Sequence, residues 1–127
     1  MNQNVSRAYV SSSVKSATPG QLVIMLYDGL IRFATDARDA MEEGRPSADL
    51  INRCIRILTE LNTCLRPDVA PEFCDRLSNL YEFYTMELSR AMHRNHPQII
   101  TAILPMISTL RDAWQEAEKQ LDEKGTA

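Results

Sequence analysis

Residues that form tight turns are scarce in this chain, which has only 4 glycines and 6 prolines among 127 residues. Sandwiches and barrels need turn residues at short, regular intervals. The composition therefore argues against an all-β fold. Apolar residues make up 44% of the chain and charged residues 24%, which is typical of a globular protein rather than a disordered one.

Cysteine is also scarce, and its spacing carries no metal or disulfide pattern. Cys54, Cys64 and Cys74 are odd in number and form no CxxC pair. Neither a paired disulfide framework nor a zinc pattern fits this arrangement. Unpaired cysteines favour a reducing compartment, so the sequence predicts a protein of the cytosol.

Long apolar runs and blocks of positive charge are absent as well. The longest wholly apolar run is far shorter than the ~20 residues that span a bilayer, and the N-terminus lacks the layout of a signal peptide. The net charge is −3, with both signs interspersed. A nucleic-acid binder would concentrate Lys and Arg on one face. We therefore expect neither membrane insertion nor nucleic-acid binding.

What the chain does contain is apolar residues at helical spacing. Four segments carry this pattern, and they span about residues 18–43, 47–66, 71–94 and 98–122. Their connections are too short for long crossovers, so sequence neighbours should pack antiparallel. The sequence thus predicts an all-α, up-down-up-down four-helix bundle formed by one domain.

The two ends of the chain differ in composition from the predicted bundle of residues 17–123. Residues 1–16 are polar and Ser-rich, and we expect them to form a flexible N-terminal arm. Residues 124–127 are expected to be a disordered tail.

Local signals mark several helix boundaries. Thr18 suits the N-cap of the first helix, Pro19 suits its first position, and Gln21 completes a capping box. Gly44 is placed to end this helix. Pro105 lies inside the fourth predicted helix and should kink it locally.

The predicted helices carry more apolar residues than a bundle core requires, which is about three positions in seven. The first helix begins with the unbroken run LVIMLY at residues 22–27. The second has an additional stripe at intervals of seven, made of Leu50, Ile57 and Cys64. Two interpretations remain open. The surplus is either imperfect patterning or a second apolar strip that a partner covers.

Few residues point to chemistry. His93 and His96 are three apart but straddle a helix end, with no third ligand beside them. There is no Gly-rich phosphate loop and no nucleophile signature. Asp28 is best explained as a hydrogen-bonded structural group, and Tyr27 and Trp114 as core aromatics. We therefore expect no catalytic site, no metal, no cofactor and no enzymatic activity.

Several stretches of the chain resemble one known family. They are AYVSSSVKSATPGQLVIMLYDG at residues 8–29, AMEEG at 40–44, LSNLYEFYTMELSRA at 77–91 and LRDAWQEA at 110–117. They are similar to the flagellar export chaperones of the FliS family. The resemblance implies a small helical bundle without enzymatic activity. It further implies that the bundle binds the disordered C-terminal segment of flagellin in the cytosol, prevents premature polymerisation and delivers flagellin for export.

The resemblance also implies that the N-terminal arm lies across part of the partner's groove and moves aside. Other flagellar export or regulatory proteins are further candidate partners. An alternative is a self-associating structural bundle whose apolar strip forms a homodimer interface. The candidate partner-binding residues are Tyr9, Val10, Val14, Leu22, Met25, Leu50, Ile57, Cys64, Ile99 and Met106.

Overall fold

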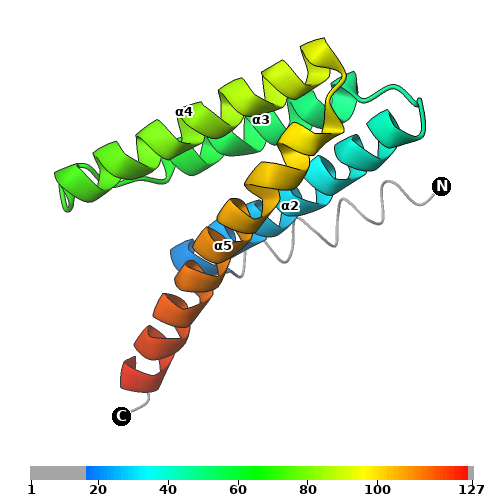
Figure 1. Cartoon of the computed structure of the whole chain (residues 1–127). Helices are drawn as coiled ribbons and strands as arrows, with labels where there is room; N and C mark the ends of the chain where they lie inside the picture. Colours follow the sequence, from blue (N-terminus) through cyan, green and yellow to red (C-terminus); the bar gives the residue numbers. More distant parts are fainter. Residues whose placement is uncertain (1–16, 126–127) are drawn as a thin grey trace.

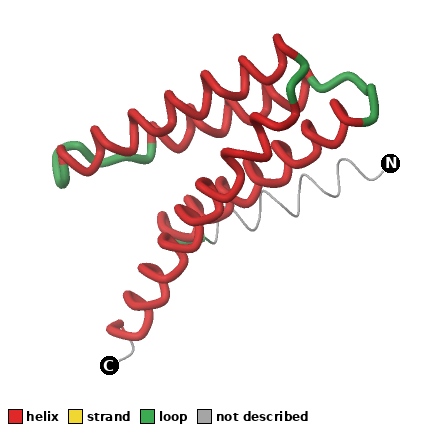
Figure 2. Tube along the Cα trace, in the orientation of Figure 1, coloured by secondary structure: helices red, strands yellow, loops and turns green. Residues whose placement is uncertain are grey.

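The computed structural model describes residues 17–125, with side chains described as far as Glu123. This part of the chain forms four helices and no strand (Figures 1 and 2). The all-α bundle predicted from the sequence is confirmed. The predicted arm, with Tyr9, Val10 and Val14, lies outside the described residues. The helices are α2 (Pro19–Glu42), α3 (Ala48–Thr63), α4 (Pro71–Arg94) and α5 (Pro97–Gly125).

Each helix packs against its two neighbours around a shared core. α2 contacts α3 and α5, and α4 contacts the same two helices. Among the described residues, the buried side chains of the core are all apolar or aromatic. The core consists of Val23, Tyr27, Leu30, Ala34, Ala37, Ala40, Met41, Ile51, Cys54, Leu58, Leu61, Cys74, Leu77, Tyr81, Tyr84, Leu88, Ala91, Ile99, Ile100, Ile103 and Ile107.

Local capping chemistry explains where the helices begin and end. The Thr18 hydroxyl accepts from the Gln21 backbone N–H at 3.1 Å, and the Gln21 side chain accepts from the Thr18 backbone N–H at 3.0 Å. This is the predicted capping box. Gly44 has a φ of 71° and Asn95 a φ of 52°, which places both residues in the left-handed region after a helix. Ser47 stands at the N-cap of α3, but its side chain makes no capping hydrogen bond.

Two helices depart from the predicted bounds. α3 ends at Thr63 rather than near residue 66, because the backbone N–H of Cys64 already turns toward the carbonyls of both Glu60 and Leu61. α5 continues to Gly125, beyond the predicted end at 122, and it is helical through Pro105. Among the described residues, no helix is both long enough and apolar enough to cross a bilayer.

Gly29 lies in the middle of α2, where α3 comes close. A Cβ built at this glycine would stand 3.3 Å from Cδ1 of Ile57, tighter than ordinary van der Waals contact. Glycine inside a helix costs about 1 kcal/mol relative to alanine. That cost is entropic, and the close approach of α3 explains why glycine nevertheless suits this position.

The C-terminal half of α5 follows α2 and diverges from α4 (Figure 1). Arg111 of α5 donates from Nε to Oδ1 of Asp28 on α2 at 2.8 Å. The Thr18 hydroxyl donates to Oε1 of Glu118 at 2.7 Å. A Cβ at Gly20 would overlap the Glu118 carboxylate, so a glycine allows this contact. Asp28 is thus a structural group between helices, as expected.

The divergence of α5 exposes two apolar side chains that the sequence pattern assigns to the core. Phe73 and Leu121 have the helical spacing of core residues, which predicts that they point inward, but they are 52% and 64% exposed. The last turns of α5 extend past the rest of the bundle, with no described helix alongside them (Figure 1). Apolar side chains at helical spacing become buried only where a second helix covers them.

We expect the close approach at Gly29 to be measurable. Gly29→Phe should lower the free energy of unfolding by about 2 kcal/mol, within the usual range for overpacking, because the ring meets Ile57. Urea unfolding followed by circular dichroism measures the loss. Adding Ile57→Ala to the variant should recover part of it by making room. A Gly29→Phe protein as stable as the parent would show that the two helices are not in tight contact.

Candidate functional site

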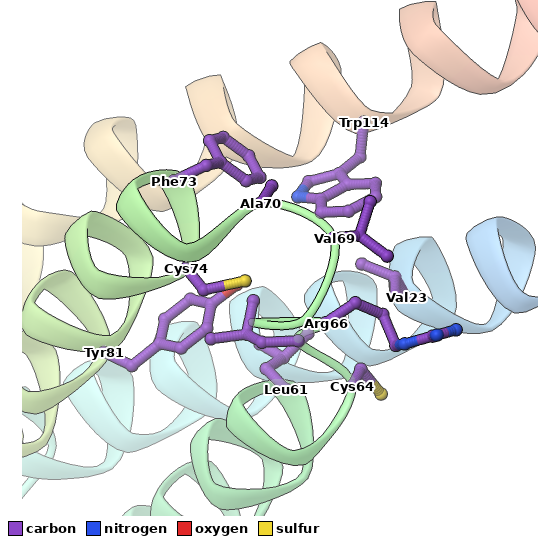
Figure 3. Close-up of a pocket in the computed structure, with 11 residues that line it drawn as sticks. Val23, Leu61, Cys64, Arg66, Val69, Ala70, Phe73, Cys74, Tyr81 and Trp114 are labelled. Carbon is purple, nitrogen blue, oxygen red and sulfur yellow. The ribbon is translucent and has the colours of Figure 1, made fainter.

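A hollow opens at the end of the bundle where α3 leads into α4 (Figure 3). We call it the end pocket. Its volume is about 190 Å³, and its walls come from all four helices and from the loop between α3 and α4. It is lined by Val23, Leu61, Cys64, Leu65, Arg66, Val69, Ala70, Phe73, Cys74, Tyr81 and Trp114.

The deepest polar group of the end pocket is the hydroxyl of Tyr81, which is paired inside the protein. It lies 2.6 Å from the hydroxyl of Tyr27, and the two ring centroids are 6.4 Å apart. Both rings are buried. The two hydroxyls therefore pair with each other inside the protein, and the floor of the end pocket is largely apolar. Such a floor favours an apolar side chain as occupant.

Burial raises the pKa of both phenols. Desolvation is the main cause in each case, because it penalises the charged phenolate. Their mutual hydrogen bond raises the pKa of Tyr81 and lowers that of Tyr27. Either hydroxyl can be the donor in this pair. Both groups stay neutral throughout the physiological range.

Hydrogen bonds within the loop between α3 and α4 fix the position of the exposed apolar side chains at the rim of the end pocket. Val69 is 70% exposed, and its backbone N–H donates to the carbonyl of Arg66 at 3.0 Å. Arg66 in turn forms two hydrogen bonds to the Asp68 carboxylate, at 3.1 and 2.8 Å. The loop is thus closed on itself. Val69 from this loop and Phe73 from the first turn of α4 lie near Trp114 (Figure 3).

A second hollow continues from the first between α4 and α5. We call it the α4–α5 groove. Its volume is about 280 Å³, and Phe73 and Trp114 line both hollows. Every lining side chain is apolar, and the exposed Leu121 lies one turn further along α5. The lining residues are Phe73, Leu77, Leu110, Ala113, Trp114 and Ala117.

The structure separates the predicted partner-binding residues. Cys64 is exposed and lines the end pocket. Leu22, Met25, Leu50 and Ile57 are half-buried on α2 and α3, away from the α4–α5 groove.

The two predicted residues of α5 lie in different environments. Met106 is 42% exposed, whereas Ile99 is 9% exposed and belongs to the core. A buried Ile99 is not accessible to a partner in the folded chain.

Most of the groove was missed by sequence reasoning. Trp114 was assigned to the core, yet it is half-buried and separates the two hollows. Ala113 and Ala117 are exposed, and neither was among the predicted partner-binding residues. The sequence did hold one signal for the groove, which is a row of apolar residues on one face of α5. The row consists of positions 110, 113, 114, 117 and 121, and it extends beyond the part of α5 that α4 can cover.

The thiols and histidines of the described residues are spread over several environments. Burial and the nearby Glu60 raise the pKa of the Cys64 thiol, so it stays protonated near neutral pH. Burial raises the pKa of Cys54 to about 12. No group of three metal-ligating side chains occurs among the described residues. His93 and His96 are exposed at the end of α4.

Comparison with known proteins gives a consistent result. The sequence profile of the family described as Flagellar protein FliS matches residues 1–121. The chain is 32% identical to Flagellar secretion chaperone FliS of Salmonella typhimurium over 110 residues, which cover 84% of this chain and 82% of that protein. It is 31% identical to the protein of the same name from Bacillus subtilis over 118 residues, covering 91% and 86%. For the Vibrio cholerae protein the identity is 25% over 116 residues, covering 90% and 85%.

The buried tyrosine pair predicts a loss of stability at alkaline pH. Both pKa values lie above the ordinary value of 10.0. The stabilisation is therefore complete below about pH 10 and is lost as the pH rises further, where the unfolded chain releases its phenolic protons first. Urea unfolding at about pH 8 and about pH 11 should show a steeper fall for the parent than for Tyr27→Phe/Tyr81→Phe. Falls of equal steepness would contradict the assignment.

Proposed function

Because this chain belongs to the FliS family of flagellar secretion chaperones, we propose that it binds the C-terminal segment of flagellin. The end pocket and the α4–α5 groove form the proposed binding site. Binding takes place in the cytosol, prevents premature polymerisation and delivers the subunit for export. Membership in a chaperone family assigns the chain a binding role rather than a catalytic one.

The observation that carries this proposal is the continuity of the two hollows. Phe73 and Trp114 belong to both, so one apolar surface runs from the loop after α3 to the exposed turns of α5. Large exposed apolar patches on a soluble protein usually mark an interaction site. Val69, Phe73 and Leu121 contribute the most exposed side chains of this surface.

The shape of the groove favours a helical occupant. Ala113 and Ala117 are small, so a partner's backbone can approach α5 closely, while Phe73 and Leu110 form walls beside them. An amphipathic helix places apolar anchors at positions i, i+3, i+4 and i+7, which matches the row on α5. A filament subunit's assembly segment is expected to have this amphipathic pattern. The end pocket then receives one larger apolar side chain beside the helix.

The energetics suit a chaperone that must release its cargo. Fully burying an apolar anchor contributes roughly 1.5–3 kcal/mol. Ordering a disordered segment on binding costs roughly 2–5 kcal/mol or more. Several anchors are therefore needed to offset the ordering cost, and the moderate net affinity that results favours release without ATP when the export apparatus takes the segment.

The single tryptophan provides a direct test, because the chain contains only one, at the junction of the two hollows. Titration with a tryptophan-free peptide of flagellin's C-terminal segment should shift the emission of Trp114 to shorter wavelength. Circular dichroism of the mixture should show more helix than the sum of the spectra of the free chain and the free peptide. Phe73→Glu should weaken binding at least about tenfold, the equivalent of roughly 1.4 kcal/mol. Its exposed position predicts little loss of thermal stability.

Met86→Glu is the matched control, because Met86 is 63% exposed on α4 and lines neither hollow. It should bind the peptide as the parent does. Equal weakening by both variants, or an unchanged Trp114 emission at saturation, would reject the proposed site. Light scattering distinguishes the homodimer alternative. A dimer that Phe73→Glu dissociates and that takes up no peptide would support self-association instead.

A thiol probe gives an independent readout of the end pocket. Cys64 is exposed, while Cys54 and Cys74 are buried. A maleimide should therefore modify Cys64 first in the folded chain, and the flagellin peptide should slow that reaction several-fold. The assay needs mildly alkaline pH because the pKa of this thiol is raised. Mass spectrometry of digested fragments identifies the modified residue, and an unprotected Cys64 in the saturated complex would exclude the end pocket from the site.

A further inference from the structure

Phe33 of α2 contacts the guanidinium groups of two arginines, Arg32 of α2 and Arg53 of α3. These two helices do not form the α4–α5 groove. The Cζ of Arg32 is 4.9 Å from the centroid of the Phe33 ring, and the Cζ of Arg53 is 5.4 Å from it. Phe33 is half-buried, whereas both arginines are exposed. Stacking on the ring attracts each guanidinium and leaves its N–H donors free around the edge. Two positive charges from two helices are thus held around one ring.

Neither of these arginines forms a salt bridge within residues 17–125. Asp36 and Asp49 stand one turn away on the same two helices, but neither carboxylate is in ion-pair contact with Arg32 or Arg53. Arg38, Arg45, Arg66, Arg90 and Arg111 do have carboxylate partners in this range. The exposed Arg56, Arg76 and Arg94 form no salt bridge there either. What distinguishes Arg32 and Arg53 is therefore the aromatic ring that they share.

An apolar strip borders this cluster where α2 meets α3. Leu26 and Gly29 line it from α2, and Leu50 and Ile57 from α3. The three side chains are half-buried and pack on the edge of the core. Gly29 has no side chain to raise the surface, and Ile57 fills the space beside it. The surface therefore combines a shallow apolar strip with two guanidinium groups at its border.

We propose that Arg32, Phe33, Arg53 and the strip beside them bind an acidic, amphipathic segment of a second protein. The carboxylates of that segment accept from the two guanidinium groups, and its apolar residues cover the strip. Guanidinium–carboxylate hydrogen bonds are among the stronger ones at protein surfaces. A free inorganic anion would pair with the guanidinium groups but would leave the apolar strip exposed to water. The combination of charge and apolar surface therefore favours a protein segment.

This surface goes beyond the proposed flagellin site. None of Arg32, Phe33 and Arg53 lines the end pocket or the α4–α5 groove. The chaperone is therefore able to hold its cargo on one side and a second protein on the other. Leu50 and Ile57, which were predicted as partner-binding residues, belong to this second surface.

A synthetic peptide tests the proposal. The probe is a short fluorescein-labelled helix-forming peptide with leucine along one face and glutamate on the other, and its matched control has glutamine in place of glutamate. Fluorescence anisotropy with the full-length chain should show that the glutamate peptide binds more tightly, and that added salt weakens it. Arg32→Gln/Arg53→Gln should weaken this binding about tenfold or more. Phe33→Leu, which keeps both charges and an apolar side chain, should weaken it several-fold.

Arg94→Gln/Lys119→Gln removes the same charge from other exposed positions and should bind as the parent does. Thermal unfolding by circular dichroism confirms that each variant folds. Equal loss in this control, or equal binding of the glutamine peptide, would overturn the proposal by reducing it to general charge attraction. Displacement of the probe by the flagellin peptide would also overturn it, because the surface would then belong to the cargo. Simultaneous binding of both peptides, with Phe73→Glu affecting flagellin alone, is the expected result.

Discussion

The course of α5 determines which surface this bundle presents. Its C-terminal half is held along α2 by the Arg111–Asp28 ion pair and the Thr18–Glu118 hydrogen bond, and not along α4. An exposed ion pair contributes only about 0–1 kcal/mol, so these contacts direct the helix more than they stabilise the fold. The consequence is that Phe73 and the apolar side chains of α5 face a gap instead of each other. The α4–α5 groove exists because the C-terminal half of α5 packs along α2 and not along α4.

The second constraint is that the main polar side chains of the end pocket already have partners within the protein. Tyr27 and Tyr81 bond to each other, and the Arg66 side chain is occupied by Asp68. A partner that enters the end pocket therefore meets apolar surface and few polar groups that require a specific complement. Recognition of this kind depends on shape and on the spacing of apolar anchors, so it tolerates changes in the partner's sequence. This tolerance suits the binding of a flexible segment and does not suit selective chemistry.

The helices were predictable from sequence because their signals are local. The capping box at Thr18 and the end of α2 at Gly44 both follow from residue type and short-range spacing. The groove was not predictable in the same way. Phe73 and Leu121 have the spacing of core residues, and only the divergence of α5 leaves them exposed. The Arg32–Phe33–Arg53 cluster was missed because its members come from two helices whose register is a tertiary property.

The separation of the two surfaces has a physical consequence for how a small chaperone is used. One side is apolar and nearly uncharged, so its affinity depends on buried area and changes little with ionic strength. The other side adds two guanidinium groups, and its affinity and association rate fall as salt screens them. Because the two proposed sites respond to different conditions, we expect a partner on the charged side to associate and dissociate without loosening the cargo. Core side chains link the two surfaces through α2, and dense packing of that core keeps both in place while either one is occupied.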